Sequence, residues 1–189
     1  ITIREGDELL EAKLTTGSSQ VVLAVKSGKA IRFEESKTRP MGRNASGVRG
    51  IKLINANDVV VGMVAVNDLD TDILVVSENG YGKKSKLEDY RITNRGGKGV
   101  KTLSVTEKTG NLVSIKNVID SDDLMIINRS GIAIRLGVET LRVMGRATQG
   151  VRLINIKQDD SIAAVAKVMN DDDDIQDVDD LNVTVEENN

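Results

Sequence analysis

The segment 91–103, RITNRGGKGVKTL, places three glycines and four cations within thirteen residues. Glycine lets a backbone approach a phosphate closely and turn its N–H groups toward it, while arginine and lysine neutralise the phosphate charge. The segment is therefore a candidate polyanion-binding loop. Its candidate residues are Arg91, Arg95, Gly96, Gly97, Lys98 and Lys101.

The chain lacks the residues that most catalytic and metal-binding sites use. The chain has no histidine and no cysteine, which removes the commonest general base, the usual catalytic triads and thiolate metal ligands. The string RGGKGVKT lacks the Lys-Ser/Thr pair of a phosphate-binding P-loop. Nothing preorganises the four aspartates at 171–174 as a metal site. We therefore expect no catalytic residue, no cofactor and no metal in this chain.

The charge is divided unevenly along the chain. All 26 lysines and arginines precede residue 170, whereas nine of the 29 acids follow it, so residues 1–169 carry a net charge of +6. A basic body predicts a polyanionic partner. We expect residues 170–189 to be an acidic, disordered tail, which either competes with the polyanion for the body or only adds solubility. No apolar run reaches the roughly 20 residues of a membrane-spanning helix.

The elements that must position these cations come from an internal repeat. Gly28, Gly80 and Gly131 lie 52 and 51 residues apart. Two sets of cations keep the same spacing: Arg43, Arg95 and Arg146, and then Arg49, Lys101 and Arg152. We divide the chain into a half repeat at 1–15, full repeats at 20–68, 72–119 and 122–169, and the acidic tail. Residues 1–15 correspond to the last two strands of a repeat.

Each full repeat is typical of four short strands. Ser27-Gly28, Asn79-Gly80 and Ser130-Gly131 suit hairpin turns that need a positive φ, and alternating apolar runs flank them. Four strands in about 50 residues is the spacing of a propeller rather than of a helical solenoid. We therefore predict an all-β, propeller-like array of four-stranded blades.

Equivalent positions of a radial array lie on successive blades, so the recurring cations predict a basic row around one rim. The alternative is that each recurring arginine forms a blade-to-blade hydrogen bond. Lys83 and Lys84 are a further candidate pair, or else part of an ordinary solvated strand. Because the chain has only two tyrosines, one phenylalanine and no tryptophan, it lacks the stacking residues of single-strand readers. Duplex phosphates are the expected ligand.

The strings MGRNASGVRGIKL, NGYGKKSKLEDY, NRGGKGVK and MGRATQGV resemble the family of C-terminal domains found in the A subunit of DNA gyrase, over residues 1–168. The resemblance implies a β-pinwheel, a propeller variant whose blades exchange strands, which wraps duplex DNA around its outer rim. The family's box Gln-Arg-Arg-Gly-Gly-Lys-Gly matches residues 93–99 in its last five positions. In the family this box lies in the first blade, whereas here it lies in the middle repeat.

The resemblance also implies a larger enzyme. This would be a bacterial, cytoplasmic, nucleoid-associated topoisomerase that introduces negative supercoils, with ATP and Mg²⁺ acting on other domains or subunits. Its partners would be the B subunit of gyrase, together with the rest of the A subunit. The alternatives are the C-terminal domain of the A subunit of topoisomerase IV and a propeller that binds proteins rather than DNA. Because propellers usually have four to eight blades, three repeats predict an open arc that self-associates through its blade edges.

Overall fold

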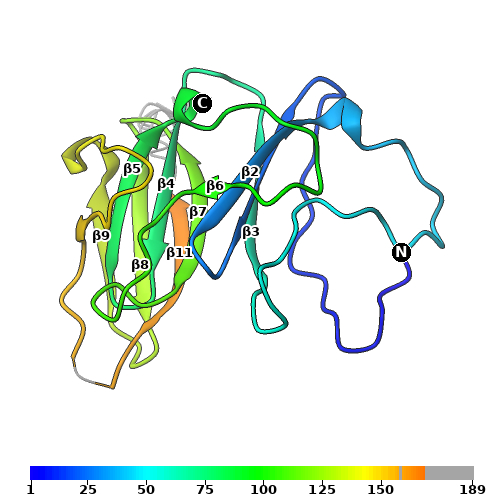
Figure 1. Ribbon diagram of the computed structural model, residues 1–189. Helices are drawn as coiled ribbons and strands as arrows, with labels where there is room; N and C mark the ends of the chain where they lie inside the picture. Colours follow the sequence, from blue (N-terminus) through cyan, green and yellow to red (C-terminus); the bar gives the residue numbers. More distant parts are fainter. Residues whose placement is uncertain (158, 169–189) are drawn as a thin grey trace, which may run out of the picture.

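The computed structural model describes residues 1–157 and 159–168 and is all-β, as predicted (Figure 1). Its strands form three antiparallel sheets, which we call blades 1, 2 and 3. The strands are β1 (Gln20–Val25), β2 (Lys29–Glu34), β3 (Val60–Val66), β4 (Asp72–Ser77), β5 (Tyr81–Lys86), β6 (Val100–Lys101), β7 (Leu112–Val118), β8 (Asp123–Asn128), β9 (Ala133–Gly137), β10 (Val151–Arg152) and β11 (Ile162–Val168). Three one-turn 3₁₀ helices follow the second strand of each repeat: Glu35–Lys37, Leu87–Asp89 and Val138–Thr140.

The hairpin prediction is confirmed in all three repeats. The pairs β1–β2, β4–β5 and β8–β9 are antiparallel, and Gly28, Gly80 and Gly131 in their turns have φ values of 79°, 77° and 87°. An L-residue with a side chain is strained at such φ values, whereas glycine is not. The turn glycines therefore fix where each hairpin reverses.

The third strand of a repeat does not join its own blade. β6 of the second repeat pairs with β2, so blade 1 has the order β3-β1-β2-β6. In the same way β10 of the third repeat pairs with β5, which gives the order β10-β5-β4-β7 in blade 2. The strand exchange implied by the family resemblance is thus present at both junctions of the described chain.

Apolar side chains fill the space between neighbouring blades. Val22 and Val64 of blade 1 pack with Ile73, Val75 and other buried residues of blade 2. A second core joins the other face of blade 2 to blade 3 through residues such as Leu74, Val76, Leu124 and Ile126. Both faces of the central blade are therefore buried, which explains why every residue of β4 is buried.

The prediction of two strands within residues 1–15 is wrong. These residues form no strand, because no described hairpin is available for them to pair with. They lie beside the edge strand β3 of blade 1 instead, where the Glu11 carboxylate accepts a hydrogen bond from the Met63 backbone N–H at 2.7 Å. The predicted acidic tail at 170–189 lies outside the described residues.

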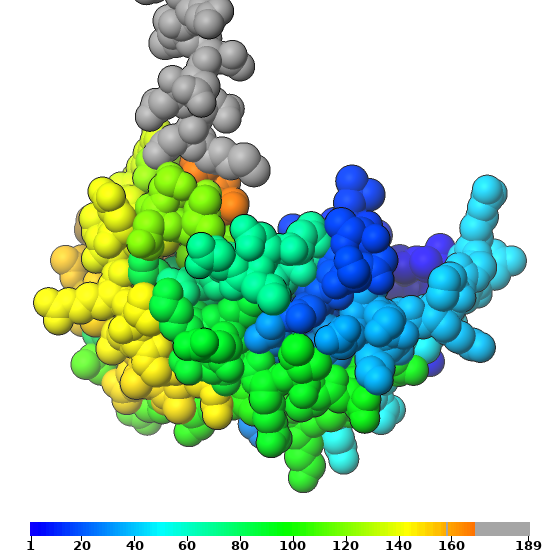
Figure 2. Space-filling view, turned by 90° about the horizontal axis from the view of Figure 1, so that it is seen from above, coloured from blue at the N-terminus to red at the C-terminus, as the bar shows by residue number. Residues whose placement is uncertain are grey.

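The three blades succeed one another across the molecule as an open array. In the space-filling view the first repeat lies at one end, the second in the middle and the third at the other end (Figure 2). Blade 3 has three strands among the described residues, β11-β8-β9, since no third strand from a following repeat pairs with β9.

Candidate nucleic-acid interface

The glycine-rich loop (residues 91–99) runs along the edge of blade 1. Ile92 forms a parallel bridge with Arg32, and the Thr93 N–H donates to the Arg32 carbonyl at 2.9 Å. A Cβ atom on Gly99 would lie 2.5 Å from the Ala30 carbonyl oxygen, and the φ of Gly99 is 68°. The loop thus needs this glycine for close contact between two backbones, rather than for the approach of a phosphate.

Arg95 and Arg146 form the blade-to-blade hydrogen bonds considered as the alternative. Arg95 donates from Nε to the Lys37 carbonyl at 2.9 Å and from Nη1 to the Arg49 carbonyl at 3.1 Å. Arg146 makes the equivalent bonds one repeat later, to Asp89 at 3.0 Å and Lys101 at 2.8 Å. Arg95 and Arg146 thus follow this alternative rather than the predicted basic row.

Arg43 belongs to the same set but has no such partner. Its side chain is exposed and makes no hydrogen bond or ion pair with a described residue. At the two later junctions the accepting carbonyls belong to the preceding blade. The Arg43 guanidinium lies at the end of the array where no described blade precedes it.

The prediction that Lys83 and Lys84 face a nucleic acid is contradicted by their burial. Lys83 is fully buried, and its Nζ donates to the Gly145 carbonyl at 2.6 Å and to Thr148 Oγ1 at 3.1 Å. Lys84 is buried as well and forms an ion pair with Asp120. Both cations are held within the protein because β5 lies inside blade 2 and is covered on both faces.

Burial also changes the protonation of Lys83. Removal from water disfavours the charged ammonium and lowers its pKa from 10.5 to about 8. Between these values the unfolded chain holds a proton that the folded chain has released, so stability rises with pH in this range. Burial raises the pKa of Tyr90 to about 12. Above about pH 10 the folded chain therefore keeps a proton that the unfolded chain loses, so this group lowers the stability as the pH rises, but only in that range.

We expect the free energy of unfolding to gain about 1–2 kcal/mol more between pH 7 and 9.5 in the unchanged chain than in Lys83→Met. Urea titrations at the two pH values measure this difference. The exposed Lys98→Met is the matched control and should keep the full pH response. An equal response in all three proteins would show that Lys83 stays charged in the folded state.

The second recurring set remains at the surface. Arg49, Lys101 and Arg152 are exposed and occupy equivalent places at the three repeats. Lys101 and Arg152 lie on the exchanged strands β6 and β10, opposite Lys29 and Tyr81. Arg152 already interacts with Tyr81. Its Nη2 donates to the Tyr81 hydroxyl at 2.8 Å, and its guanidinium lies 5.3 Å from the centre of that ring.

The structure identifies a further set that the sequence reading missed. Arg39 and Arg142 occupy the positions equivalent to Arg91, one repeat earlier and one later, and all three are exposed. None of the three side chains bonds to another residue in the ranges 1–157 and 159–168. The signal was present in the sequence, since the same spacings of 52 and 51 residues separate them.

We give the name basic rim to seven exposed cations that come from the recurring sets and the glycine-rich loop. Its members are Arg39, Arg49, Arg91, Lys98, Lys101, Arg142 and Arg152. Gly96 and Gly97 lie between these cations in the glycine-rich loop, and the backbone N–H of Gly96 is already bonded to the Gly50 carbonyl. The rim presents charge without aromatic stacking residues, which suits contacts to phosphates.

The part of the chain that the structure describes was also searched for a metal site and for a membrane-spanning helix. It contains no group of three or more acidic residues, histidines or cysteines that could hold a metal ion. None of its helices is long and apolar enough to cross a membrane.

Comparison with known proteins agrees with the geometry. Residues 20–67, 71–119 and 122–169 match a family model described as the DNA gyrase C-terminal domain, beta-propeller. The chain is 46% identical to the A subunit of DNA gyrase from Staphylococcus aureus strain MRSA252 over 174 residues, which are 92% of this chain and 20% of that protein. The identity to the protein of strain NCTC 8325 / PS 47 is also 46%, over 175 residues. The chain thus spans about a fifth of the length of these curated relatives.

Two solved structures have similar folds. A DNA gyrase A C-terminal domain matches with a TM-score of 0.81 and 25% identity, covering 89% of this chain and 57% of that one. The C-terminal domain of a DNA topoisomerase IV matches with a TM-score of 0.82 and 24% identity, covering 88% and 52%. At this identity the second likeness bears on the fold alone.

Proposed function

Because the chain belongs to the family of DNA gyrase C-terminal domains, we propose that its basic rim binds duplex DNA and bends it around successive blades. The observation that carries the proposal is the recurrence of unpaired, exposed arginines at one position of every repeat: Arg39, Arg91 and Arg142. Bending 20–30 base pairs by 40–90° costs on the order of 1–6 kcal/mol. A row that continues from blade to blade supplies the several phosphate contacts needed to offset this cost.

The proposed parent is a topoisomerase of the gyrase type. In it, DNA wrapped on this domain would be presented to cleavage and ATP-hydrolysing parts that lie elsewhere, with ATP and Mg²⁺ bound outside this chain. The partners would be the B subunit of gyrase, the rest of the A subunit, and the bacterial chromosome, in the cytoplasm. This chain itself is proposed to contribute binding and bending, and no bond-breaking chemistry.

Relaxation of a closed circular plasmid tests bending directly. The plasmid is incubated with the chain at low salt, relaxed by a separate topoisomerase I and then deproteinised. Wrapping with a fixed hand should leave a linking number shifted in one direction, in proportion to the protein added. Retardation of a linear duplex without such a shift would support binding and contradict wrapping. Failure of both would contradict the proposed function.

A further inference from the structure

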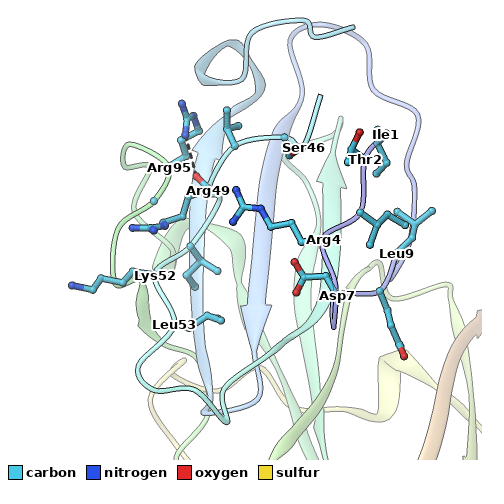
Figure 3. Close-up of a pocket in the computed structure, with 16 residues that line it drawn as sticks. Ile1, Thr2, Arg4, Asp7, Leu9, Ser46, Arg49, Lys52, Leu53 and Arg95 are labelled. Carbon is cyan, nitrogen blue, oxygen red and sulfur yellow. Dashed lines mark hydrogen bonds between the residues drawn. The ribbon is translucent and has the colours of Figure 1, made fainter. Parts of the chain in front are cut away.

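The three cations of the second recurring set differ in how firmly their side chains are held. Arg49 lines a cavity of about 1000 Å³ (Figure 3), and its guanidinium forms no hydrogen bond or ion pair with a described residue. The Lys101 ammonium is likewise without a partner in the ranges 1–157 and 159–168. Arg152 is different, because two other side chains accept hydrogen bonds from its guanidinium.

Tyr81 and Asn155 fix the Arg152 guanidinium. Its Nε and Nη2 both donate to the Tyr81 hydroxyl, at 3.2 and 2.8 Å, and its Nη1 donates to Asn155 Oδ1 at 3.1 Å. A guanidinium has five N–H groups, so one N–H on Nη1 and one on Nη2 remain. These two nitrogen atoms lie side by side in the guanidinium plane. A pair of N–H groups placed in this way matches two oxygens of one phosphate.

Tyr81 has little freedom of its own. It is the first residue of β5, directly after the turn glycine Gly80, and it is only 6% exposed. Its backbone is paired in register with that of Arg152 on the exchanged strand β10. Lys108 lies 5.3 Å from the centre of the Tyr81 ring. An arginine that is already held loses less conformational freedom when it binds a phosphate, so the binding is tighter.

The equivalent place at the junction of blade 1 has no hydroxyl group. There Lys29 lies opposite Lys101 of β6. Lys101 is exposed although a further repeat follows it, so exposure belongs to this position of the repeat. Lys101 and Arg152 therefore both face solvent, but of these two only Arg152 is oriented in advance.

We propose that Tyr81 is a positioning residue for DNA binding: it holds Arg152 so that the remaining N–H groups of Nη1 and Nη2 bind two oxygens of one phosphate. This inference rests on the proposed function, because it requires duplex DNA to meet the basic rim. Tyr81 contacts no phosphate itself and acts through Arg152. Arg152 thus contributes more to the affinity than Lys101 does, although the two side chains carry the same charge.

Tyr81→Phe tests this role, because it removes the hydroxyl but keeps the ring and the charge of the chain. The affinity for a labelled duplex of about 40 base pairs at low salt should fall roughly three- to tenfold, which is the cost of immobilising one long side chain. The slope of affinity against salt should not change, since no cation is lost. Fluorescence anisotropy titrations at several salt concentrations measure both quantities.

Tyr90→Phe is the matched control, since Tyr90 is the other tyrosine of the chain. Its hydroxyl is buried and lies 2.5 Å from Thr102 Oγ1, within the core between blades 1 and 2. Loss of this hydrogen bond should lower the melting temperature and leave the affinity for DNA within about twofold. If both variants lose affinity equally, the effect is a general one of damaged packing and the proposal is overturned.

A double-mutant cycle shows whether Tyr81 acts through Arg152. In an Arg152→Gln background, Tyr81→Phe should have no further effect on affinity. In a Lys101→Gln background it should keep its full effect. Asn155→Ala removes the other contact of the guanidinium and should likewise weaken binding only while Arg152 is present.

Three results would overturn the proposal: an unchanged affinity in Tyr81→Phe, a reduced salt slope in that variant, or a loss that persists in the Arg152→Gln background. In each of these cases the unchanged chain still binds duplex DNA, and the proposed function stands. Failure of the unchanged chain to bind the duplex at low salt would instead contradict the proposed function, and the role of Tyr81 with it.

Discussion

Duplex DNA should bind this chain roughly 10³–10⁵ times more tightly at about 50 mM salt than at about 200 mM, provided that 6–10 phosphates are neutralised. The reason is release of the counterions condensed on the duplex, which salt opposes. The basic rim offers seven exposed cations from three repeats, of which Arg152 is shared with Tyr81. The expected slope therefore lies toward the shallow end of this range.

Fluorescence anisotropy with a labelled duplex of about 40 base pairs measures the effect, with two unrelated sequences for comparison. The two sequences should bind within a few-fold of each other, because phosphate contacts carry no sequence information. An affinity that ignores salt would contradict phosphate contacts as the source of binding. A strong preference for one sequence would indicate base contacts that the rim residues do not predict.

The second large effect concerns the set that recurs at every repeat. Replacing Arg39, Arg91 and Arg142 with glutamate should weaken duplex binding on the order of 10²–10³-fold and lower the salt slope by about 3, one for each phosphate that is no longer neutralised. Because these side chains are exposed and bond to no described residue, the melting temperature should change little.

The matched control carries the same change in charge at exposed positions that are not members of the basic rim. Lys26, Arg129 and Lys157 are exposed, and Lys26 and Arg129 lie next to the hairpin turns. Their replacement with glutamate should cost far less affinity. If both triple variants weaken binding equally, net charge governs the interaction and the rim has no special place. If the rim variant unfolds, its arginines are structural.

Arg95 and Arg146 show where sequence reasoning reached its limit. Their recurrence was visible, but a guanidinium that bonds to a carbonyl of another blade and one that points to solvent leave the same pattern in the sequence. The choice depends on carbonyls 45–58 residues away. Of the residues that face solvent, Arg49, Lys101 and Arg152 were found by the same recurrence. Arg91 was found only as part of the glycine-rich loop, and its equivalents Arg39 and Arg142 were overlooked.

The fold could be predicted from the sequence more fully than the site. Turn glycines and alternating apolar residues predict the hairpins because those signals are local. The exchanged strands are only two residues long, too short for any alternation to reveal their partner. Burial of Lys83 was equally hidden, since the string YGKKSK reads as a polar strand. It becomes an interior strand only because blades pack against both of its faces.

The exchanged strand also bears on how the chain is synthesised. Blade 1 has its first three strands by Val66, yet its fourth is Val100–Lys101. A ribosome must therefore extend the chain by 35 residues beyond Val66, to Lys101, before blade 1 is complete. Until then, the β2 edge is unpaired outside the exit tunnel, and an unpaired edge can bind a strand of another chain. Translation speed across residues 67–101 thus sets how long each nascent molecule remains vulnerable to its neighbours on the same messenger RNA.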